Sequence, residues 1–271
     1  MIYFVSTPIG NLKDITLRAL DVLKSVNIIA CEDTRTSKTL LDHYDIKPEK
    51  LISYHKFNEQ ESSEKLIALA VSGKDIAIIS DAGTPVISDP GNVLTKKLCE
   101  KQIPFTVIPG ANAVLPALLL SGFNANRFFF AGFLPEKNSD KQKLISEVIS
   151  LSSTLIFYIS PHSLNADLNY LYNQLGKRKA CLVKELTKIY ESRYEFVLGD
   201  EITINNKGEF VLIVEGKAEE NLDDLSIFDH VSFYINLGMT KNDAIKKVAK
   251  ERNLAKNEVY KEVLNIQSNR I

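Results

Sequence analysis

Short β-rich runs alternate with helical patterns over the first 122 residues, and this alternation limits the possible folds more than any other feature. The apolar runs are Ile2–Ser6, Ile28–Cys31, Leu51–His55, Ile76–Ser80 and Phe105–Ile108. Apolar residues recur at helical spacing after the first run, at Leu17, Leu20, Leu23 and Val26. Strands that alternate with helices form βαβ units with a mainly parallel sheet. The sequence therefore predicts an α/β domain over residues 1–122.

A second series of β-rich runs follows, but with fewer helical patterns between them. The runs begin at Phe128, Thr154, Ala180, Tyr194 and Phe210. Only the segments 139–150 and 162–175 are convincing helices. Because parallel pairs need long crossovers, the short connections predict hairpins and a mixed sheet over residues 123–218. Two adjacent α/β domains leave a cleft, where small-molecule sites tend to lie.

The end of the chain has a different character. An acidic segment, 219–224, precedes an apolar run and two further helical patterns, 240–252 and 255–264, which are joined by a short turn. This pattern predicts a helix-turn-helix-like tail over residues 226–271. From residue 226 on, eight Lys and Arg side chains face five Asp and Glu side chains. Contact with nucleic acid and a solvated helix face both explain this excess.

Bulk composition excludes several classes of protein. The formal net charge is −1, so no global field attracts a polyanion, and any contact with nucleic acid must be local. No apolar stretch approaches the roughly 20 residues of a membrane-spanning helix, and no basic leader is present, so we expect a cytoplasmic protein. Cys31, Cys99 and Cys181 lie far apart beside apolar residues, which predicts reduced core thiols. The four histidines show no ligand spacing with them, so no metal site is expected.

Three loops rich in Pro and Gly follow predicted strands, at residues 7–12, 80–91 and 109–113. Because the carboxyl ends of parallel strands meet at one edge of a sheet, these loops could converge on one ligand. None of them carries a Walker pattern or a G-x-G-x-x-G pattern, which favours a ligand without a pyrophosphate. S-adenosylmethionine is such a ligand, and small residues suit its adenine: Ala82, Gly83, Ala111, Asn112 and Ala113. Tight βα turns would also explain these loops.

Seven segments of this chain match the motifs of a known protein family, and they occur in the same order. They are the segments 7–12, 32–35, 80–91, 109–110, 132–135, 184–188 and 208–216. Together they resemble the ribosomal RNA small subunit methyltransferase I family, a branch of the tetrapyrrole methylase superfamily. The resemblance runs from residue 2 to about 216, and the tail resembles the helix-turn-helix appendage of that family.

The resemblance implies a class III S-adenosylmethionine-dependent methyltransferase fold, with two α/β domains and the cofactor in the cleft between them. The implied reaction is methylation of the ribose 2′-hydroxyl of a cytidine in the decoding region of 16S rRNA, within the small ribosomal subunit. Homodimers are usual in the superfamily. Two other functions stay open: a methyltransferase acting on a tetrapyrrole or another small molecule, and a non-catalytic ribosome-binding protein.

The resemblance also places the cofactor. Thr84 stands where the wider superfamily has Asp, which leaves Asp81 or Asp89 to supply the acidic acceptor. The expected cofactor-binding residues are Pro8, Gly10, Asp81, Gly83, Thr84, Ile87, Gly110, Asn112, Ala113, Tyr158 and Ile159. Ile159 and Ser163 depart from the family, which has Glu and Arg there. If that pair forms a salt bridge, its joint loss strands no charge; if either residue touches substrate, activity or specificity changes.

Residues that act on the acceptor are harder to assign. Lys184, Glu185 and Lys188 cluster at a strand end, where a neighbouring Glu could tune one Lys towards neutrality and make it a base. A solvated charge cluster is the alternative. On the RNA side we expect Asp33 with Arg35, which suits a phosphate, and His55 with Asn58, as a base and a contact to a nucleotide edge. Phe57, which precedes Asn58, offers an aromatic ring for stacking a base.

Overall fold

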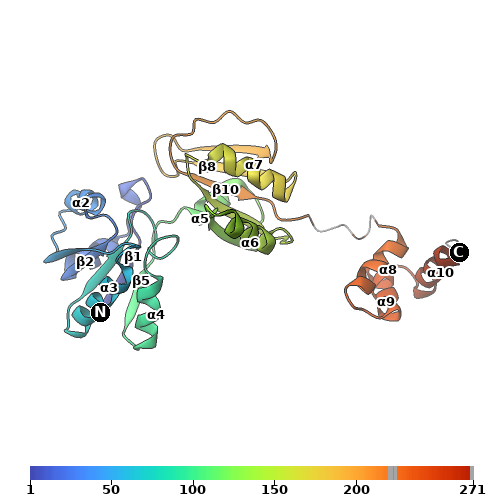
Figure 1. Cartoon of the computed structure of the whole chain (residues 1–271), viewed down its shortest axis with the longest axis horizontal. Coiled ribbons are helices and arrows are strands. Elements are labelled where there is room, and N and C mark those ends of the chain that lie inside the picture. Colours follow the sequence, from blue (N-terminus) through green and yellow to red (C-terminus); the bar gives the residue numbers. More distant parts are fainter. Residues whose placement is uncertain (219–221, 223–224, 269–271) are drawn as a thin grey trace. The chain divides into compact units, whose positions relative to one another are not determined.

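The computed structural model describes residues 1–218, 222 and 225–268, and the chain divides into two compact units, 1–217 and 218–271. Most of the acidic segment expected before the tail, 219–221 with 223–224, lies outside the described residues, as do 269–271. Figure 1 shows strands and helices in the first unit and helices in the second. In the part of the chain that the structure describes, no helix has the length and apolar character needed to cross a membrane.

The first sheet is parallel throughout and confirms the predicted α/β architecture. Its strand order is β3-β2-β4-β1-β5. The strands are β1 (Ile2–Val5), β2 (Ile28–Cys31), β3 (Lys50–Ser53), β4 (Ile76–Ile79) and β5 (Phe105–Ile108). Alternate residues of each strand enter two separate hydrophobic cores, because successive side chains point to opposite faces. The sheet is thus buried on both sides, as all-parallel sheets are.

Four helices cover this sheet. One core contains α1 (Leu17–Ser25) and α2 (Thr34–His43), whereas the other contains α3 (Glu59–Val71) and α4 (Asn92–Glu100). A short 3₁₀ helix, η1 (Leu12–Asp14), follows the first strand. Since each crossover is a helix, every strand ends at the same edge of the sheet, and the connecting loops gather there.

The second sheet is mixed, as the short connections predicted. Its order is β6-β7-β10-β8-β9, with β6 and β7 parallel and the other pairs antiparallel. The strands are β6 (Phe128–Phe133), β7 (Thr154–Ile159), β8 (Lys179–Lys184), β9 (Ser192–Val197) and β10 (Phe210–Val214). One face packs against the only helices expected in this region, α6 (Asn138–Val148) and α7 (Leu164–Leu175).

The other face of the second sheet is covered by α5 (Val114–Ser121), which follows the last strand of the first sheet. Its residues Val114, Ala117 and Leu118 share a core with strand residues such as Ile156 and Val183, and Figure 1 shows the helix beside the second sheet. The helix ends at Gly122, in the left-handed conformation with φ 70°. The domain boundary between residues 122 and 123 stays a prediction. Helix α5 precedes this boundary in the sequence but packs against the second sheet.

The cysteines correct one expectation. Cys31 and Cys181 are buried free thiols, as predicted, but Cys99 is exposed. It lies on α4, whose inward residues are Leu94 and Leu98. A residue next to an inward position on a helix is turned about 100° away from it, so Cys99 faces solvent.

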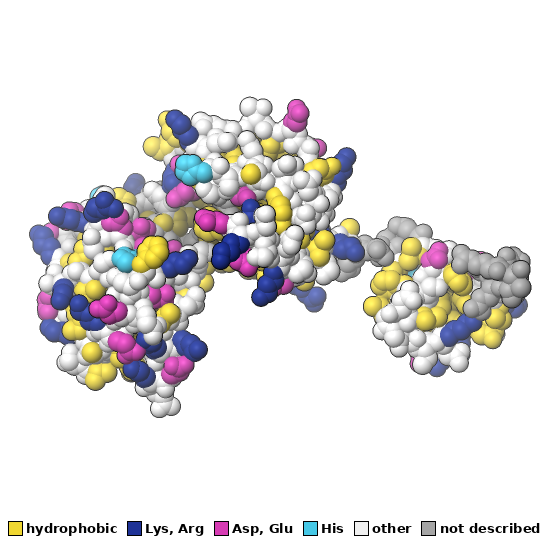
Figure 2. All heavy atoms as spheres, in the orientation of Figure 1, with side chains coloured by type: hydrophobic (Ala, Val, Ile, Leu, Met, Phe, Trp, Pro, Cys, Tyr) yellow, Lys and Arg dark blue, Asp and Glu magenta, His cyan; other side chains and the backbone are white. Residues whose placement is uncertain are grey.

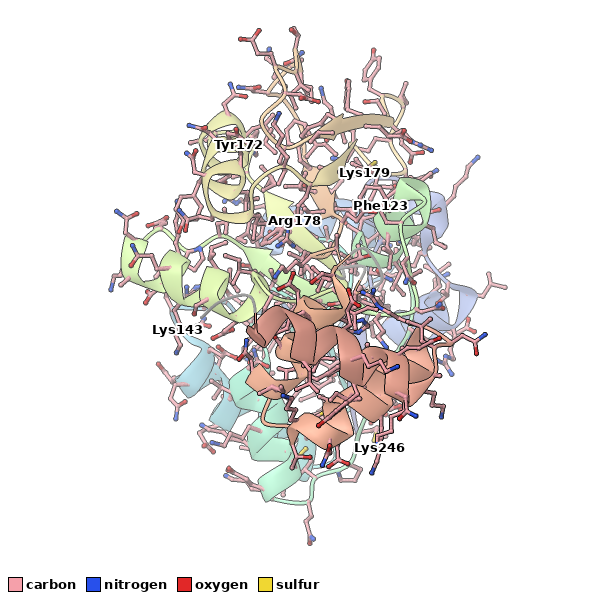
Figure 3. All side chains as sticks on the ribbon, turned by 90° about the vertical axis from the view of Figure 1, so that its right-hand side faces the viewer. Phe123, Lys143, Tyr172, Arg178, Lys179 and Lys246 are labelled. Carbon is pink, nitrogen blue, oxygen red and sulfur yellow. The ribbon has the colours of Figure 1, made fainter. Side chains whose placement is uncertain are left out.

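The second unit is a bundle of three helices: α8 (Ile227–Asn236), α9 (Lys241–Glu251) and α10 (Lys256–Ser268). Its core contains four residues of α9 that recur at the spacing of one helix face: Ala244, Ile245, Val248 and Ala249. Arg252 closes the bundle, because its guanidinium donates to His230 Nδ1 at 3.0 Å and to the carbonyl of Leu222. Lys246 projects outward from α9 (Figure 3).

Candidate active site

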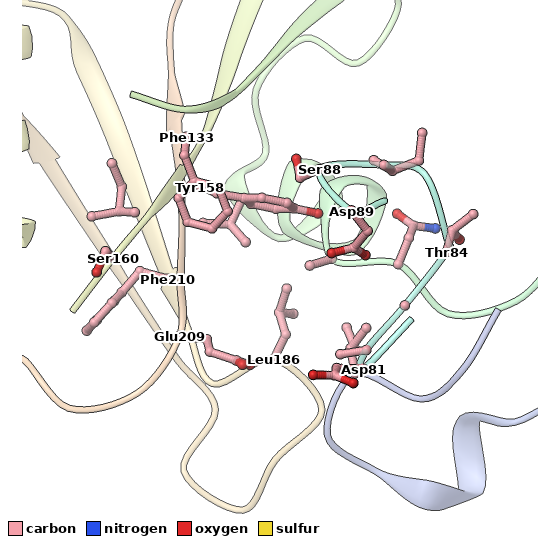
Figure 4. Close-up of a pocket in the computed structure, with 18 of the residues that line it drawn as sticks. Asp81, Thr84, Ser88, Asp89, Phe133, Tyr158, Ser160, Leu186, Glu209 and Phe210 are labelled. Atoms are coloured by element: carbon pink, nitrogen blue, oxygen red, sulfur yellow. The ribbon is translucent and has the colours of Figure 1, made fainter. Parts of the chain in front are cut away.

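A cavity of about 470 Å³ opens in the first unit, at the carboxyl ends of the first sheet and beside one end of the second sheet (Figure 4). Loops of the first sheet form one wall and strands of the second sheet form the other. It is lined by Ile9, Glu32, Asp81, Ala82, Gly83, Thr84, Ile87, Ser88, Asp89, Asn112, Ala113, Phe133, Tyr158, Ile159, Ser160, Pro161, Val183, Leu186, Glu209, Phe210 and Val211. This volume suits a nucleoside-sized ligand.

The three Pro/Gly loops meet at this cavity. The backbone of Thr7 and that of Gly83 exchange two hydrogen bonds, of 2.8 and 3.0 Å. The Thr84 hydroxyl lies 3.0 Å from that of Ser6 and donates to the carbonyl of Ala111. Each loop is therefore bonded to the next, which holds their backbones as a continuous wall.

The loop after β4 is strained. Val86 and Ser88 adopt φ angles of 78° and 66°, which are costly for residues with a Cβ, above all for a β-branched one. The loop closes at Gly91 with φ 141°, and a Cβ there would lie 2.5 Å from Cγ2 of Val86. Only glycine fits that position. Such strain persists where the surroundings impose it, and it concentrates at ligand sites.

Glu59 fixes the end of this loop from α3. Its Oε1 accepts hydrogen bonds from the backbone N–H groups of Gly91 and Val93, at 2.7 and 3.0 Å, and from the hydroxyl of Tyr54. The first N–H groups of α4 are therefore satisfied within the protein. This helix start is not available to bind the phosphate of a ligand.

Four carboxylates line the cavity: Glu32, Asp81, Asp89 and Glu209. No Lys, Arg or His occurs among the described residues of its lining. Burial, reinforced by the negative charges of Glu32 and Asp81, raises the pKa of Asp89 to about 6. Burial and the charge of Asp81 also raise the pKa of Glu32. Like charges disfavour one another's ionisation, and a bound cation would relieve this repulsion. The cavity therefore favours a cationic ligand.

Aromatic side chains complete the wall on the side of the second sheet. The rings of Phe133 and Tyr158 lie 5.3 Å apart, and the Tyr158 hydroxyl points towards Asp89 (Figure 4). Burial and the charges of Asp89 and Glu209 raise the pKa of Tyr158 to about 12, so the phenol is neutral and can donate. The cavity thus joins apolar faces to acidic acceptors. This combination fits a ligand that is aromatic at one end and cationic at another.

Most of the expected cofactor-binding residues lie in this lining: Asp81, Gly83, Thr84, Ile87, Asn112, Ala113, Tyr158 and Ile159. Pro8, Gly10 and Gly110 do not. Pro8 is buried. A Cβ at Gly10 would lie 2.5 Å from Cγ of Lys188, and one at Gly110 would lie 3.0 Å from Cβ of Ser6. The two glycines allow close packing behind the wall.

The three residues expected to act as bases lie outside the lining. Lys188 Nζ lies 2.9 Å from carboxylate oxygens of both Glu185 and Glu209. Although partial burial opposes it, these bonds raise the pKa of Lys188, which is the opposite of the neutral lysine expected. Lys184 Nζ donates to the carbonyl of Asn205 at 3.0 Å. The cluster contacts the cavity through one member of its network, Glu209.

Three of the residues expected on the RNA side have their polar groups engaged nearby. Asp33 and Arg35 form an ion pair of 2.7 Å, in which bonds from Arg35 lower the pKa of Asp33 to about 2. The N–H of Asp33 donates to Asp81 Oδ1 at 3.0 Å. The side chain of Asn58 is bonded within its own loop, to the N–H of His55 and the carbonyl of Ser53.

Several lining residues escaped the sequence analysis. Glu32 directly follows a strand and belongs to a noted motif, so its position was a usable signal. Glu209 and Phe210 reach the cavity because β10 pairs antiparallel with both β7 and β8, which residue spacing could not reveal. Ile159 is buried on the wall, whereas the Ser163 hydroxyl donates to Asp167 at 2.5 Å.

Within the described residues, no group of three or more His, Cys, Asp or Glu could hold a metal ion.

Comparison with known proteins decides the family. The family described as Tetrapyrrole (Corrin/Porphyrin) Methylases matches residues 1–200. Two relatives are called ribosomal RNA small subunit methyltransferase I. That of Bacillus subtilis (strain 168) is 42% identical, covering 96% of this chain and 92% of the relative. That of Halalkalibacterium halodurans is 43% identical, covering 96% and 93%. The chain belongs to the tetrapyrrole methylase family, within its ribosomal RNA small subunit methyltransferase I branch.

Two solved structures share this fold at low sequence identity. Diphthine synthase superposes with a TM-score of 0.64 at 14% identity, covering 80% of this chain and 89% of the other. The methyltransferase CobJ superposes with a TM-score of 0.62 at 16% identity, covering 80% and 94%. The chain is therefore a methyltransferase with an α/β fold that contains two β-sheets.

Proposed function

We propose that this methylase transfers a methyl group from S-adenosylmethionine to the ribose 2′-hydroxyl of a cytidine in the decoding region of 16S rRNA, acting on the small ribosomal subunit in the cytoplasm. Its relatives carry the name of a small-subunit rRNA methyltransferase. The observation that carries the proposal is the cavity, which combines four carboxylates with apolar walls at the end of a parallel sheet.

The residues present fit this methyl donor. S-adenosylmethionine supplies an electrophilic methyl group on a positively charged sulfonium. Ala82, Gly83 and Ala113 leave room for a flat base, while Asp81 can accept bonds from hydroxyl or ammonium groups. The summed negative charge of the four carboxylates stabilises a cation bound in the cavity, where water screens charges less than in bulk solvent.

Asp89 is the proposed acceptor of the ribose proton. A carboxylate with a pKa of about 6 is ionised at pH 7.5 and is a stronger base than an ordinary Asp. The Tyr158 phenol, which points towards Asp89, can hold its carboxylate in place. We assign Glu185 and Lys188 a positioning role, since they hold Glu209 at the cavity rather than touching it themselves.

The acidic cavity also limits how RNA can bind. Phosphates are repelled by the four carboxylates, so the target ribose must enter while its neighbouring phosphates stay outside. Charges of both signs are interspersed over the face shown in Figure 2, in keeping with the near-zero net charge. Local cations such as Arg35 and the exposed Lys246 of the tail are the proposed phosphate contacts.

We also propose a homodimer. The helix that covers the second sheet exposes Leu115 and Leu119, the latter by 74%. One edge strand of each sheet exposes an apolar residue too, Val107 on β5 and Phe128 on β6. Exposed apolar side chains and unpaired strand edges both favour association. Light scattering of the wild type and of Leu119→Lys tests this: we expect a dimer and a monomer, and a monomeric wild type contradicts it.

The test of function is a transfer assay. The purified protein is incubated with S-adenosylmethionine labelled in its methyl group and small subunits from cells that lack the modification. We expect label in 16S rRNA at a ribose, recognised because a 2′-O-methyl blocks alkaline cleavage of the next phosphodiester. Label in a small molecule instead of rRNA would favour the small-molecule methyltransferase. Binding of the donor without transfer would favour a non-catalytic ribosome-binding protein.

A further inference from the structure

Phe57 holds a large apolar ring almost entirely in solvent. Its side chain is 95% exposed, in the loop between β3 and α3. Full exposure of a phenylalanine leaves its apolar area in water, at a cost of roughly 1.5–3 kcal/mol relative to burial. The exposure of this ring raises the question of which partner covers it.

Hydrogen bonds hold the backbone of the loop that carries this ring. The backbone N–H of His55 donates to Oδ1 of Asn58 at 2.8 Å, and the N–H of Asn58 donates back to the carbonyl of His55 at 3.0 Å. The Asn58 amide also donates to the carbonyl of Ser53. The imidazole of His55 supports the ring edge to face, with centroids 6.1 Å apart. A ring held out by its own loop loses little freedom when it binds a partner.

The ring also lies near the cavity. Strands β2 and β3 are parallel neighbours, with Cys31 opposite Ser53, so the residues that follow them lie side by side. After β2 comes Glu32, which lines the cavity. His55 lies close enough to Glu32 to oppose the rise in its pKa. The exposed ring is therefore at the edge of the active site.

The neighbours of the ring indicate what it binds. Lys56 is exposed beside it, and the Arg35 side chain, in the first turn of α2 after the adjacent strand β2, is 90% exposed. A surface that binds a folded protein would surround the ring with further apolar side chains, whereas here the next residues are charged or polar. Aromatic rings interleaved with cations are the pattern that binds unpaired nucleotides, with bases stacked and phosphates paired.

We propose that Phe57 stacks on the base of an unpaired nucleotide beside the nucleotide that is methylated. The ring is a positioning residue: it holds the strand so that the target ribose enters the cavity while its neighbour stays at the edge. This inference rests on the proposed rRNA methyltransferase activity.

The chain contains no tryptophan, so Phe57→Trp introduces a single fluorescent reporter at the ring. Titration with a single-stranded RNA oligonucleotide and with unmodified small subunits should quench the indole by stacking. The matched control is Val71→Trp, at a side chain 73% exposed. Val71 ends α3, about 20 Å along the helix from its start and thus away from the loop edge. Binding without quenching of the Phe57→Trp indole overturns the proposal.

Kinetics supply the second test. With Phe57→Ala we expect the KM for small subunits to rise about 5- to 150-fold, the range for loss of one stacked base. The affinity for S-adenosylmethionine and the thermal stability should not change. Phe57→Tyr should restore the KM, Phe57→Leu should not, and Val71→Ala should match the wild type. An unchanged KM for Phe57→Ala, or full rescue by Leu, contradicts stacking.

The two proposals fail in different ways. If the wild type transfers no methyl group to small subunits, the proposed activity is wrong, and quenching of the Phe57→Trp indole by RNA still decides the stacking. If the wild type is active but Phe57→Ala has a normal KM and the indole of Phe57→Trp stays unquenched, only the stacking is wrong.

Discussion

Replacing Asp89 by Asn should make the protein more stable and less active. In the folded protein the pKa of Asp89 is about 6, above the ordinary value of 3.8. Folding therefore favours the protonated form, and ionisation of the carboxylate lowers stability increasingly from about pH 4 upwards, with the full cost above pH 6. A difference of about two pKa units corresponds to about 3 kcal/mol, which screening at this partly exposed group reduces to about 2 kcal/mol. Asn carries no charge, so it escapes this cost.

Because folding raises the pKa of Asp89, the stability gained by Asp89→Asn depends on pH in a definite direction. The advantage of Asp89→Asn should be complete near pH 8, about half as large at pH 5, and nearly gone at pH 3, where Asp is mostly protonated in both states. Thermal unfolding at pH 8 should show a Tm about 4–8 °C above that of the wild type, from about 2 kcal/mol in a domain of this size. Methyl transfer should fall about 10²- to 10⁴-fold, the usual contribution of a general base.

The control is Asp21→Asn, an exposed position on α1 that should change stability by less than about 0.5 kcal/mol. Equal unfolding curves for Asp89→Asn and wild type at pH 8 would show that the carboxylate is not strained by its neighbours. Normal methyl transfer by a stable Asp89→Asn protein would remove Asp89 as the proton acceptor.

Three further changes test the walls of the site. Gly91→Ala should destabilise the protein by about 1–3 kcal/mol in chemical denaturation, because its Cβ would overlap Val86; unfolding like that of the wild type would disprove the close packing. Glu59→Gln should lower affinity for S-adenosylmethionine by calorimetry, since the loop end at Gly91 loses charged hydrogen bonds of about 1.5–3 kcal/mol, and unaltered affinity would argue against that support. Lys188→Met should weaken donor binding by releasing Glu209 without moving the pH profile of transfer; a shifted profile would instead make Lys188 a base.

The sequence predicted the sheets and loops well because those signals are local. Apolar runs of four to six residues bounded by Pro and Gly specify strands and their ends, and helical spacing specified the inward face of α9. The loops at residues 80–91 and 109–113 were expected to face one ligand, and residues of both line the cavity. Their carboxyl-end position follows from parallel topology alone.

The misses came from contacts between distant segments. Nothing local to α5 shows that it packs on the second sheet rather than the first. Glu209 reaches the cavity through antiparallel pairing, and Lys188 is bonded to two carboxylates that raise its pKa rather than lower it. Asn58, expected to contact RNA, has its side chain bonded within its loop, which leaves the neighbouring ring as the exposed group.

The most direct measurement is binding of S-adenosylmethionine to the purified protein by calorimetry, with Asp81→Ala as the test variant. Asp75→Ala, whose carboxylate pairs with the N-terminus at 2.9 Å outside the cavity, is the matched control. We expect one site per chain, an affinity weakened about tenfold or more by Asp81→Ala, and no effect of Asp75→Ala. No binding to the wild type, or equal binding by all three proteins, would contradict the assignment of this cavity to the methyl donor.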